Sequence, residues 1–120
     1  MIQHSHAIIF KQAPLQNQSG QDGLELALTL ATFEQPVALF FTGAGVLQLS
    51  RNIQGELAGR KTYTDAFKSL ELYDIDQIYV CESSLSEFAL SGDQLTIEVD
   101  ILDNQAWRDK LAEHDRALTF

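Results

Sequence analysis

Short apolar runs alternate with longer amphipathic stretches along this chain. The runs at residues 6–10, 37–41 and 78–80 are nearly continuous in apolar side chains. Such runs are typical of strands that are buried on both faces of a sheet. Apolar residues between the first two runs recur at the spacing of one helix face: Leu24, Ala27, Leu28 and Ala31. This spacing predicts a helix over residues 23–34, with Asp22 as its N-cap.

The second half of the chain continues the alternation. We expect a short helix around Val46–Leu49, a helix over residues 63–72 that Thr62 caps, and another over residues 84–90. Apolar residues then alternate with polar ones at Leu95, Ile97 and Val99, which is typical of a strand with one wet face. Asp103 is expected to cap a last helix, and residues 117–120 to form a final short strand.

Strands separated by helices imply parallel pairing through right-handed crossovers. The predicted fold class is therefore α/β: a small parallel sheet with helices on both faces, layered as in flavodoxin, in one domain over residues 1–120. Core positions are expected on the apolar strands and on the first helix, namely Phe10, Leu28, Val37, Leu39, Phe41, Ile78 and Val80. The polar loop at residues 11–20 and the stretch at residues 50–61 are the least regular parts.

Charge and cysteine content exclude several classes of function. The chain has 120 residues, with 17 acidic against 8 basic side chains and a net charge of −9. This charge opposes a phosphate backbone, so we expect no direct binding to nucleic acid, free tRNA included. The single cysteine excludes an internal disulfide and fits a reducing compartment. No apolar stretch reaches the ~20 residues that cross a bilayer, so no membrane anchor is expected. The N-terminus has no basic start followed by an apolar run, so no signal peptide is expected.

Cys81 is the candidate for chemistry. It lies where the apolar strand at residues 78–80 passes into a predicted helix, and in α/β sheets ligands and reactions collect at that edge. The positive end of a helix favours a thiolate, which points to a nucleophilic or sulfur-carrying thiol. The competing interpretation is a small buried apolar residue. Glu82 is adjacent and would raise the pKa of the thiol, and no cationic partner is evident in the sequence.

The other candidate sites have simpler interpretations. Gly43 and Gly45 follow a strand but lack the third glycine or lysine of a phosphate loop, so they indicate a tight turn. His4, His6 and His114 could in principle bind a metal, although a solvated terminal pair explains His4 and His6. Asp74 and Asp76 indicate a solvated turn. The sequence therefore predicts neither a cofactor nor a metal.

Several motifs together resemble the DsrE/DsrF-like family. They begin with Ala13-Pro14, Asp22-Gly23-Leu24, Val37-x-Leu39-Phe40-Phe41 and Gly45-Val46-Leu47-Gln48-Leu49. Further motifs are similar to the TusC (DsrF) branch of that family: Phe67-x-x-Leu70-x-Leu72-Tyr73-Asp74-Ile75, Tyr79-Val80-Cys81, Ser84-Leu85 and Leu118-x-Phe120. The resemblance covers essentially the whole chain.

This resemblance implies a subunit of a cytoplasmic sulfur relay. In the family, TusB-like, TusC-like and TusD-like subunits form a dimer of heterotrimers. The complex passes persulfide sulfur to a TusE-like acceptor for 2-thiolation of a wobble uridine in tRNA. The relay cysteine belongs to the TusD branch, so the resemblance implies an accessory, non-catalytic subunit. The alternative is a thiol-based sulfurtransferase that acts through Cys81 itself.

Overall fold

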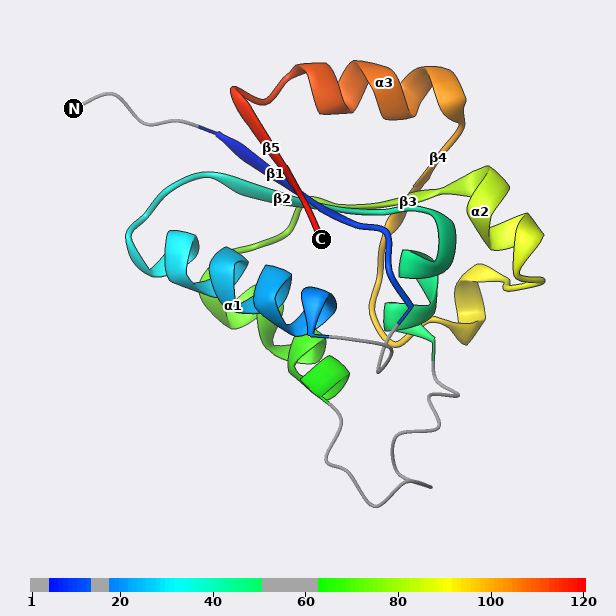
Figure 1. The fold of residues 1–120 in the computed structure, drawn as a ribbon, viewed down its shortest axis with the longest axis horizontal. Coiled ribbons are helices and arrows are strands. Elements are labelled where there is room, and N and C mark those ends of the chain that lie inside the picture. Colours follow the sequence, from blue (N-terminus) through cyan, green and yellow to red (C-terminus); the bar gives the residue numbers. More distant parts are fainter. Residues whose placement is uncertain (1–4, 14–17, 51–62) are drawn as a thin grey trace.

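Five parallel strands form one sheet in the computed structural model, which describes residues 5–13, 18–50 and 63–120. Their order across the sheet is β4-β3-β2-β1-β5 (Figure 1). Every neighbouring pair is parallel. The strands are β1 (His6–Phe10), β2 (Val37–Phe41), β3 (Ile78–Cys81), β4 (Asp100–Leu102) and β5 (Arg116–Thr119). The predicted α/β class with a parallel sheet is confirmed.

Helices lie on both faces of this sheet. The α-helices are α1 (Ser19–Thr32), α2 (Glu82–Glu87) and α3 (Asn104–Ala112), and the 3₁₀ segments are η1 (Gly43–Leu49), η2 (Tyr63–Tyr73) and η3 (Gly92–Gln94). In Figure 1, α1 and η2 lie below the sheet and α3 lies above it. Helix α2 lies at the end of β3, where the chain leaves the sheet.

The larger core cluster fills the space between the sheet and the α1–η2 layer. Phe10 and Phe41 stack with their ring centroids 4.7 Å apart, and Phe67 of η2 meets both rings edge-on at 5.7 and 5.5 Å. Most of the strand residues predicted for the core are buried here: Phe10, Leu39, Phe41, Ile78 and Val80. The two remaining predictions, Leu28 and Val37, are half-buried and pack against the same cluster.

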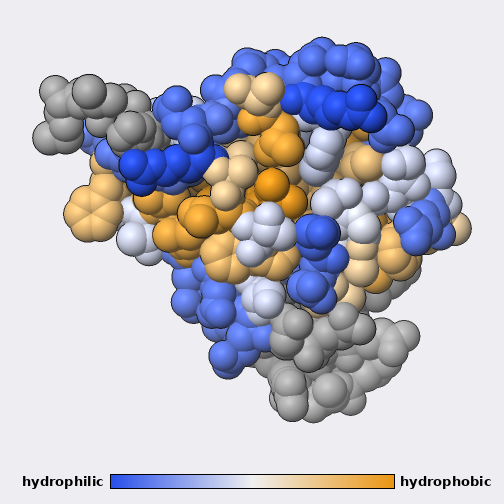
Figure 2. Space-filling view, turned by 45° about the horizontal axis from the view of Figure 1, so that its top comes forward, coloured by the Kyte–Doolittle hydropathy of each residue, from blue (hydrophilic) through white to orange (hydrophobic). Residues whose placement is uncertain are grey.

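A smaller cluster lies on the α3 face. Its buried members are Ala7, Ala38, Phe40 and Tyr79, with Trp107 and Leu111 of α3 packed against them. The Trp107 ring meets Phe40 edge-on at 5.2 Å. Helix α3 does not extend over the whole face, and all four residues of β5 are exposed. Figure 2 shows this side, with hydrophobic surface next to a hydrophilic α3.

Three predicted elements differ from the structure. Helix α1 begins at Ser19 rather than at residue 23, so Asp22 lies inside its first turn instead of capping it. There its negative charge interacts favourably with the positive end of the helix dipole. The segment at residues 63–73 is a 3₁₀ helix. The predicted strand at residues 95–99 is wrong: pairing with β3 begins only at Asp100, and Leu95 is buried in an isolated bridge to Ser50.

Two predictions at the carboxyl-terminal end are confirmed, although the bounds of the final strand differ slightly from those predicted. The Asp103 side chain accepts a hydrogen bond from the backbone of Ala106 at 2.8 Å and so caps α3. The final strand exists as Arg116–Thr119, and it pairs with β1 at the edge of the sheet. The proposed Thr62 cap, Pro14 to Asn17 and residues 51–62 lie outside the described residues.

Candidate functional site at the end of strand β3

Cys81 is the last residue of β3 and the N-cap of α2. Side chains alternate along a strand, so Cys81 points to the same face as Tyr79, the α3 face. The thiol is buried, with 7% of the residue exposed. Its Sγ lies 3.1 Å from Ser83 Oγ, a short contact for a sulfur hydrogen bond. The sequence therefore placed the thiol correctly at the strand-to-helix junction.

Hydrogen bonds lower the pKa of Cys81 below its ordinary value. Burial is the strongest single influence and acts in the opposite direction, but the side chains and backbone of Ser83 and Ser84 together outweigh it. Glu82 is exposed, and the net shift runs opposite to the upward shift that its charge led us to expect. A Cys-x-Ser-Ser sequence was the available signal for this effect, because serine hydroxyls in a first helical turn can reach back to the N-cap.

Ser84 ties the end of β3 to the end of β2. Its Oγ accepts a hydrogen bond from the backbone N–H of Gly43 at 2.8 Å and lies 3.4 Å from Thr42 Oγ1. Gly43 has a φ of 55°, a conformation that glycine adopts at low cost. Because Ser84 occupies its N–H, this amide is not free to bind a phosphate. The interpretation of the Gly43–Gly45 segment as a tight turn fits this geometry.

Gly45 allows close approach of the turn to β1. A Cβ at this position would lie 1.9 Å from the backbone oxygen of Phe10, well inside van der Waals contact. Segment η1 can therefore lie directly against the end of β1, next to the Ser84 contact. The ends of β1, β2 and β3 are thus held together by the close contact of Gly45 with the Phe10 backbone and by the hydrogen bonds of Ser84.

The histidines lie at the amino-terminal ends of the strands, whereas Cys81 lies at a carboxyl-terminal end. His6 begins β1 and His114 precedes β5, whereas Cys81 ends β3, and all these strands are parallel. A Cys–His pair is therefore not formed by either of them. His6 is buried, which corrects the expectation of a solvated pair, and His4 lies outside the described residues. No group of three metal-ligating side chains occurs within residues 5–13, 18–50 and 63–120.

The surroundings of His114 favour its neutral form. Burial is the main cause that lowers the pKa of His114, and His6 and Lys110 lower it further, against the opposing charges of Glu113 and Asp115. Its ring meets Phe40 edge-on at 5.6 Å, and the Nδ1 atoms of both His6 and His114 are buried without a hydrogen-bond partner among the described residues. The pair is therefore part of the packing of the α3 face.

The remaining predicted candidate is the pair of aspartates before β3. Asp74 and Asp76 are both exposed, and Asp74 has a φ of 60°. They therefore form a solvated turn, as expected.

In the part of the chain that the structure describes, no helix has both the length and the apolar character needed to cross a bilayer.

Comparisons with known proteins agree with the fold and extend over the whole chain. A model of the DsrE/DsrF-like family matches residues 4–120. A TusC homolog of Aliivibrio fischeri is 33% identical over 93% of this chain and 95% of that protein. TusC of Buchnera aphidicola from Schizaphis graminum is 36% identical over 95% of this chain and 97% of that protein. The crystal structure of the ychN protein from E. coli has a TM-score of 0.79 at 20% identity, covering 99% of this chain and all of that one.

Proposed function

Because this chain belongs to the DsrE/DsrF-like family, in its TusC branch, we propose that it is an accessory subunit of a sulfurtransferase complex that thiolates tRNA. The complex would relay persulfide sulfur for 2-thiolation of the wobble uridine. The observation that carries this proposal is the similarity to TusC proteins over almost the full length of both chains.

The partners follow from the same family. We propose that the chain assembles as one domain with TusB-like and TusD-like subunits in a dimer of heterotrimers, in the cytoplasm. The complex would deliver sulfur to a TusE-like acceptor. A net charge of −9 opposes direct contact with nucleic acid, so the tRNA would be reached through other components.

An accessory role fits the surroundings of Cys81. The residue is only 7% exposed, so a donor persulfide could approach its sulfur only after local movement. The main groups that lower the pKa of the thiol are serine hydrogen bonds rather than a cation, and His6 and His114 lie at the amino-terminal ends of their strands, opposite to Cys81. A thiol that carries sulfur for a partner needs access as well as a thiolate.

The lowered pKa of Cys81 supports the alternative, a sulfurtransferase that acts through this thiol. In that reaction the Cys81 thiolate would attack the terminal sulfur of a donor persulfide, R–S–SH. The donor S–S bond would break, a new S–S bond would form on Cys81, and the donor would leave as the thiolate R–S⁻. Ser83 would stabilise the Cys81 thiolate before attack.

One experiment in cells separates the two roles. Deleting the chain should abolish wobble-uridine thiolation, measured by mass spectrometry of tRNA nucleosides, whereas Cys81→Ser should leave it near normal. Ser83→Ala is the matched control, because it removes the hydrogen bond to Sγ while keeping the thiol. Co-purification with the sister subunits shows that each variant still assembles.

Two outcomes would contradict the proposal in different ways. Normal thiolation after deletion would remove the chain from the relay altogether. Lost thiolation in a Cys81→Ser variant that still assembles would make Cys81 a relay residue and favour the alternative.

A further inference from the structure

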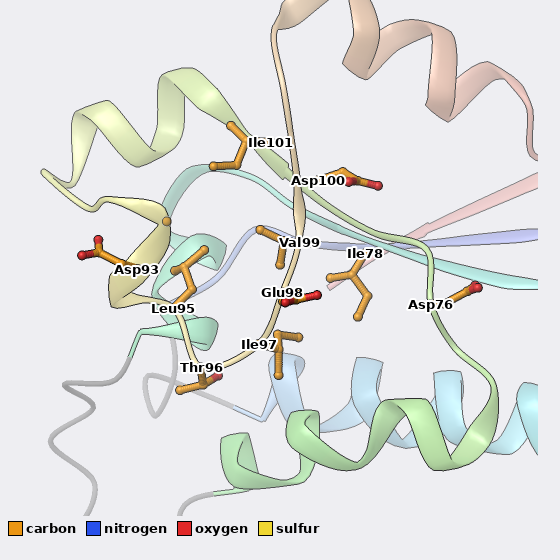
Figure 3. Close-up of a pocket in the computed structure, with 11 residues that line it drawn as sticks. Asp76, Ile78, Asp93, Leu95, Thr96, Ile97, Glu98, Val99, Asp100 and Ile101 are labelled. Carbon is orange, nitrogen blue, oxygen red and sulfur yellow. The ribbon is translucent and has the colours of Figure 1, made fainter.

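A groove lined by both apolar and acidic side chains opens along the β4 edge of the sheet (Figure 3). Its volume is about 610 Å³. The apolar lining comes from β3 and from the segment that leads into and through β4: Ile78, Leu95, Ile97, Val99 and Ile101. A neighbouring cavity of about 490 Å³ shares Ile78 and Ile97 and extends toward Phe67 and Leu70 of η2. Together the two cavities offer a surface in which apolar side chains lie among charged ones.

Carboxylates surround the larger cavity. Asp76, Asp93, Glu98 and Asp100 all line it and are all exposed, and no lysine or arginine is among its lining residues. None of the four forms an ion pair within the described ranges of the chain. Figure 3 shows them distributed around the apolar side chains rather than gathered at one point. The groove therefore combines apolar side chains with an excess of negative charge, while Lys68 lines the neighbouring cavity together with Asp76 and Glu98.

The backbone at the groove is also open to pairing. Strand β4 is the end of the sheet and pairs with β3 on one side only. An edge strand presents unpaired N–H and C=O groups that an extended segment of another protein can use. Along this edge, Val99 and Ile101 alternate with Glu98 and Asp100. A strand added here would meet apolar and acidic side chains in alternation.

We propose that the β4 groove docks an extended segment of a partner protein in which lysine or arginine alternates with apolar residues. The apolar side chains of that segment would pack against Ile97, Val99 and Ile101. Its cations would face Glu98 and Asp100, in a cavity lined by four carboxylates and by no lysine or arginine. This proposal goes beyond the sulfur relay and does not depend on it.

The same charges argue against a second copy of this chain. Pairing two β4 edges would bring the carboxylates of Glu98 and Asp100 close to those of the second copy, and like charges opposite each other destabilise a sheet. Acidic residues on the edge strand thus protect it from self-association while leaving it open to a basic segment. Charge complementarity selects the occupant.

A designed peptide tests the proposal on the full chain, in the assembly in which it purifies. The probe is a fluorescein-labelled peptide of about eight residues, the length of an ordinary strand, that alternates valine with lysine. Fluorescence anisotropy measures its binding. Controls are a peptide of the same composition with all lysines in one block, and one that alternates valine with glutamate. We expect binding of the alternating lysine peptide and not of the glutamate peptide.

Paired variants locate the binding. The double variant Glu98→Gln with Asp100→Asn should weaken binding of the lysine peptide about 10-fold or more, because two charge pairs are lost. Glu82→Gln with Glu87→Gln removes the same charge from α2 and should have little effect. Ile101→Ser should weaken binding without any change in charge. Hydrogen exchange should slow in β4 on binding, whereas exchange in β5, the other edge of the sheet, should not change.

Several results would overturn the proposal. These are no binding of the alternating peptide, equal binding of the block peptide, or equal weakening by the α2 variants. Displacement by spermidine at concentrations equal to that of the peptide would indicate a site for small cations instead. None of these measurements reads tRNA thiolation, so failure here leaves the proposed function standing, and failure of that function leaves this result standing.

Discussion

The two faces of the sheet are packed very differently. On the α1–η2 face, aromatic rings from β1, β2 and η2 stack and meet edge-on in one continuous cluster, with Phe10, Phe41 and Phe67 at its centre. On the α3 face, the buried residues are few and two of them are alanines. Since hydrophobic stabilisation scales with buried apolar area, the first face contributes most of the stability of the fold.

The lightly packed face carries most of the perturbed titratable groups. Cys81, Tyr79 and His114 all belong to the α3 side, and the pKa of each departs from its ordinary value. Burial raises the pKa of Tyr79, against the opposing charge of Lys110, whose Nζ lies 5.9 Å from the ring centroid. A fold can therefore keep a robust core on one side of a sheet and place polar chemistry on the other.

The largest expected effect comes from truncating one leucine on each face. Leu39→Ala should destabilise the fold by about 2–5 kcal/mol, because Leu39 is fully buried in the larger cluster. Leu111→Ala, the same change on the half-buried α3 face, should cost about 1 kcal/mol. Urea denaturation measures both free energies of unfolding. Equal losses for the two variants would contradict the difference between the faces.

A smaller effect is expected from pH on the α3 face. Burial lowers the pKa of His114 in the folded protein, so the unfolded chain takes up a proton at this residue first. Stability should be highest above the ordinary histidine pKa of about 6.5 and should fall as the pH drops below it. His114→Phe should remove this part of the pH dependence while keeping a ring against Phe40. Denaturation midpoints at successive pH values measure it, and an unchanged slope in the variant would refute it.

The smallest effect concerns the thiol. Ser83→Ala removes a hydrogen bond to Sγ and should raise the pKa of Cys81 toward its ordinary value. The thiolate absorbance, taken as the difference from a Cys81→Ser protein during a pH titration, measures this pKa. Glu82→Gln is the control and should leave the titration unchanged. A shift with Glu82→Gln and none with Ser83→Ala would show that the Glu82 charge, not the serine hydrogen bond, controls the pKa of the thiol.

The candidate site could be located from the sequence, but its electrostatics could not. A strand-to-helix junction is visible in the apolar run before Cys81 and the polar residues after it, and the structure confirms this junction. The direction of the pKa shift depends on whether the Ser83 and Ser84 groups or the Glu82 carboxylate lie nearer to the thiol. Adjacency along the chain does not determine this distance, because Glu82 turns toward solvent at the start of α2.

The β4 groove could not be predicted from the sequence either. The alternation of Leu95, Ile97 and Val99 is visible and predicts a strand, yet only Asp100–Leu102 pairs with β3. The apolar residues before β4 line a groove instead, because Leu95 is held by the bridge to Ser50. Long-range contacts outweighed the local pattern here.

By itself, the sequence determined the layered α/β architecture, the principal core strands and the position of Cys81, because hydrophobic periodicity and turn residues act locally. Tertiary structure decided what depends on residues distant in the chain. It placed β5 beside β1, joined Ser84 to Gly43, separated the histidines from Cys81 and opened an acid-rimmed groove at β4. Each of these rests on packing and hydrogen bonding between segments whose separation in sequence carries no information about their distance in space.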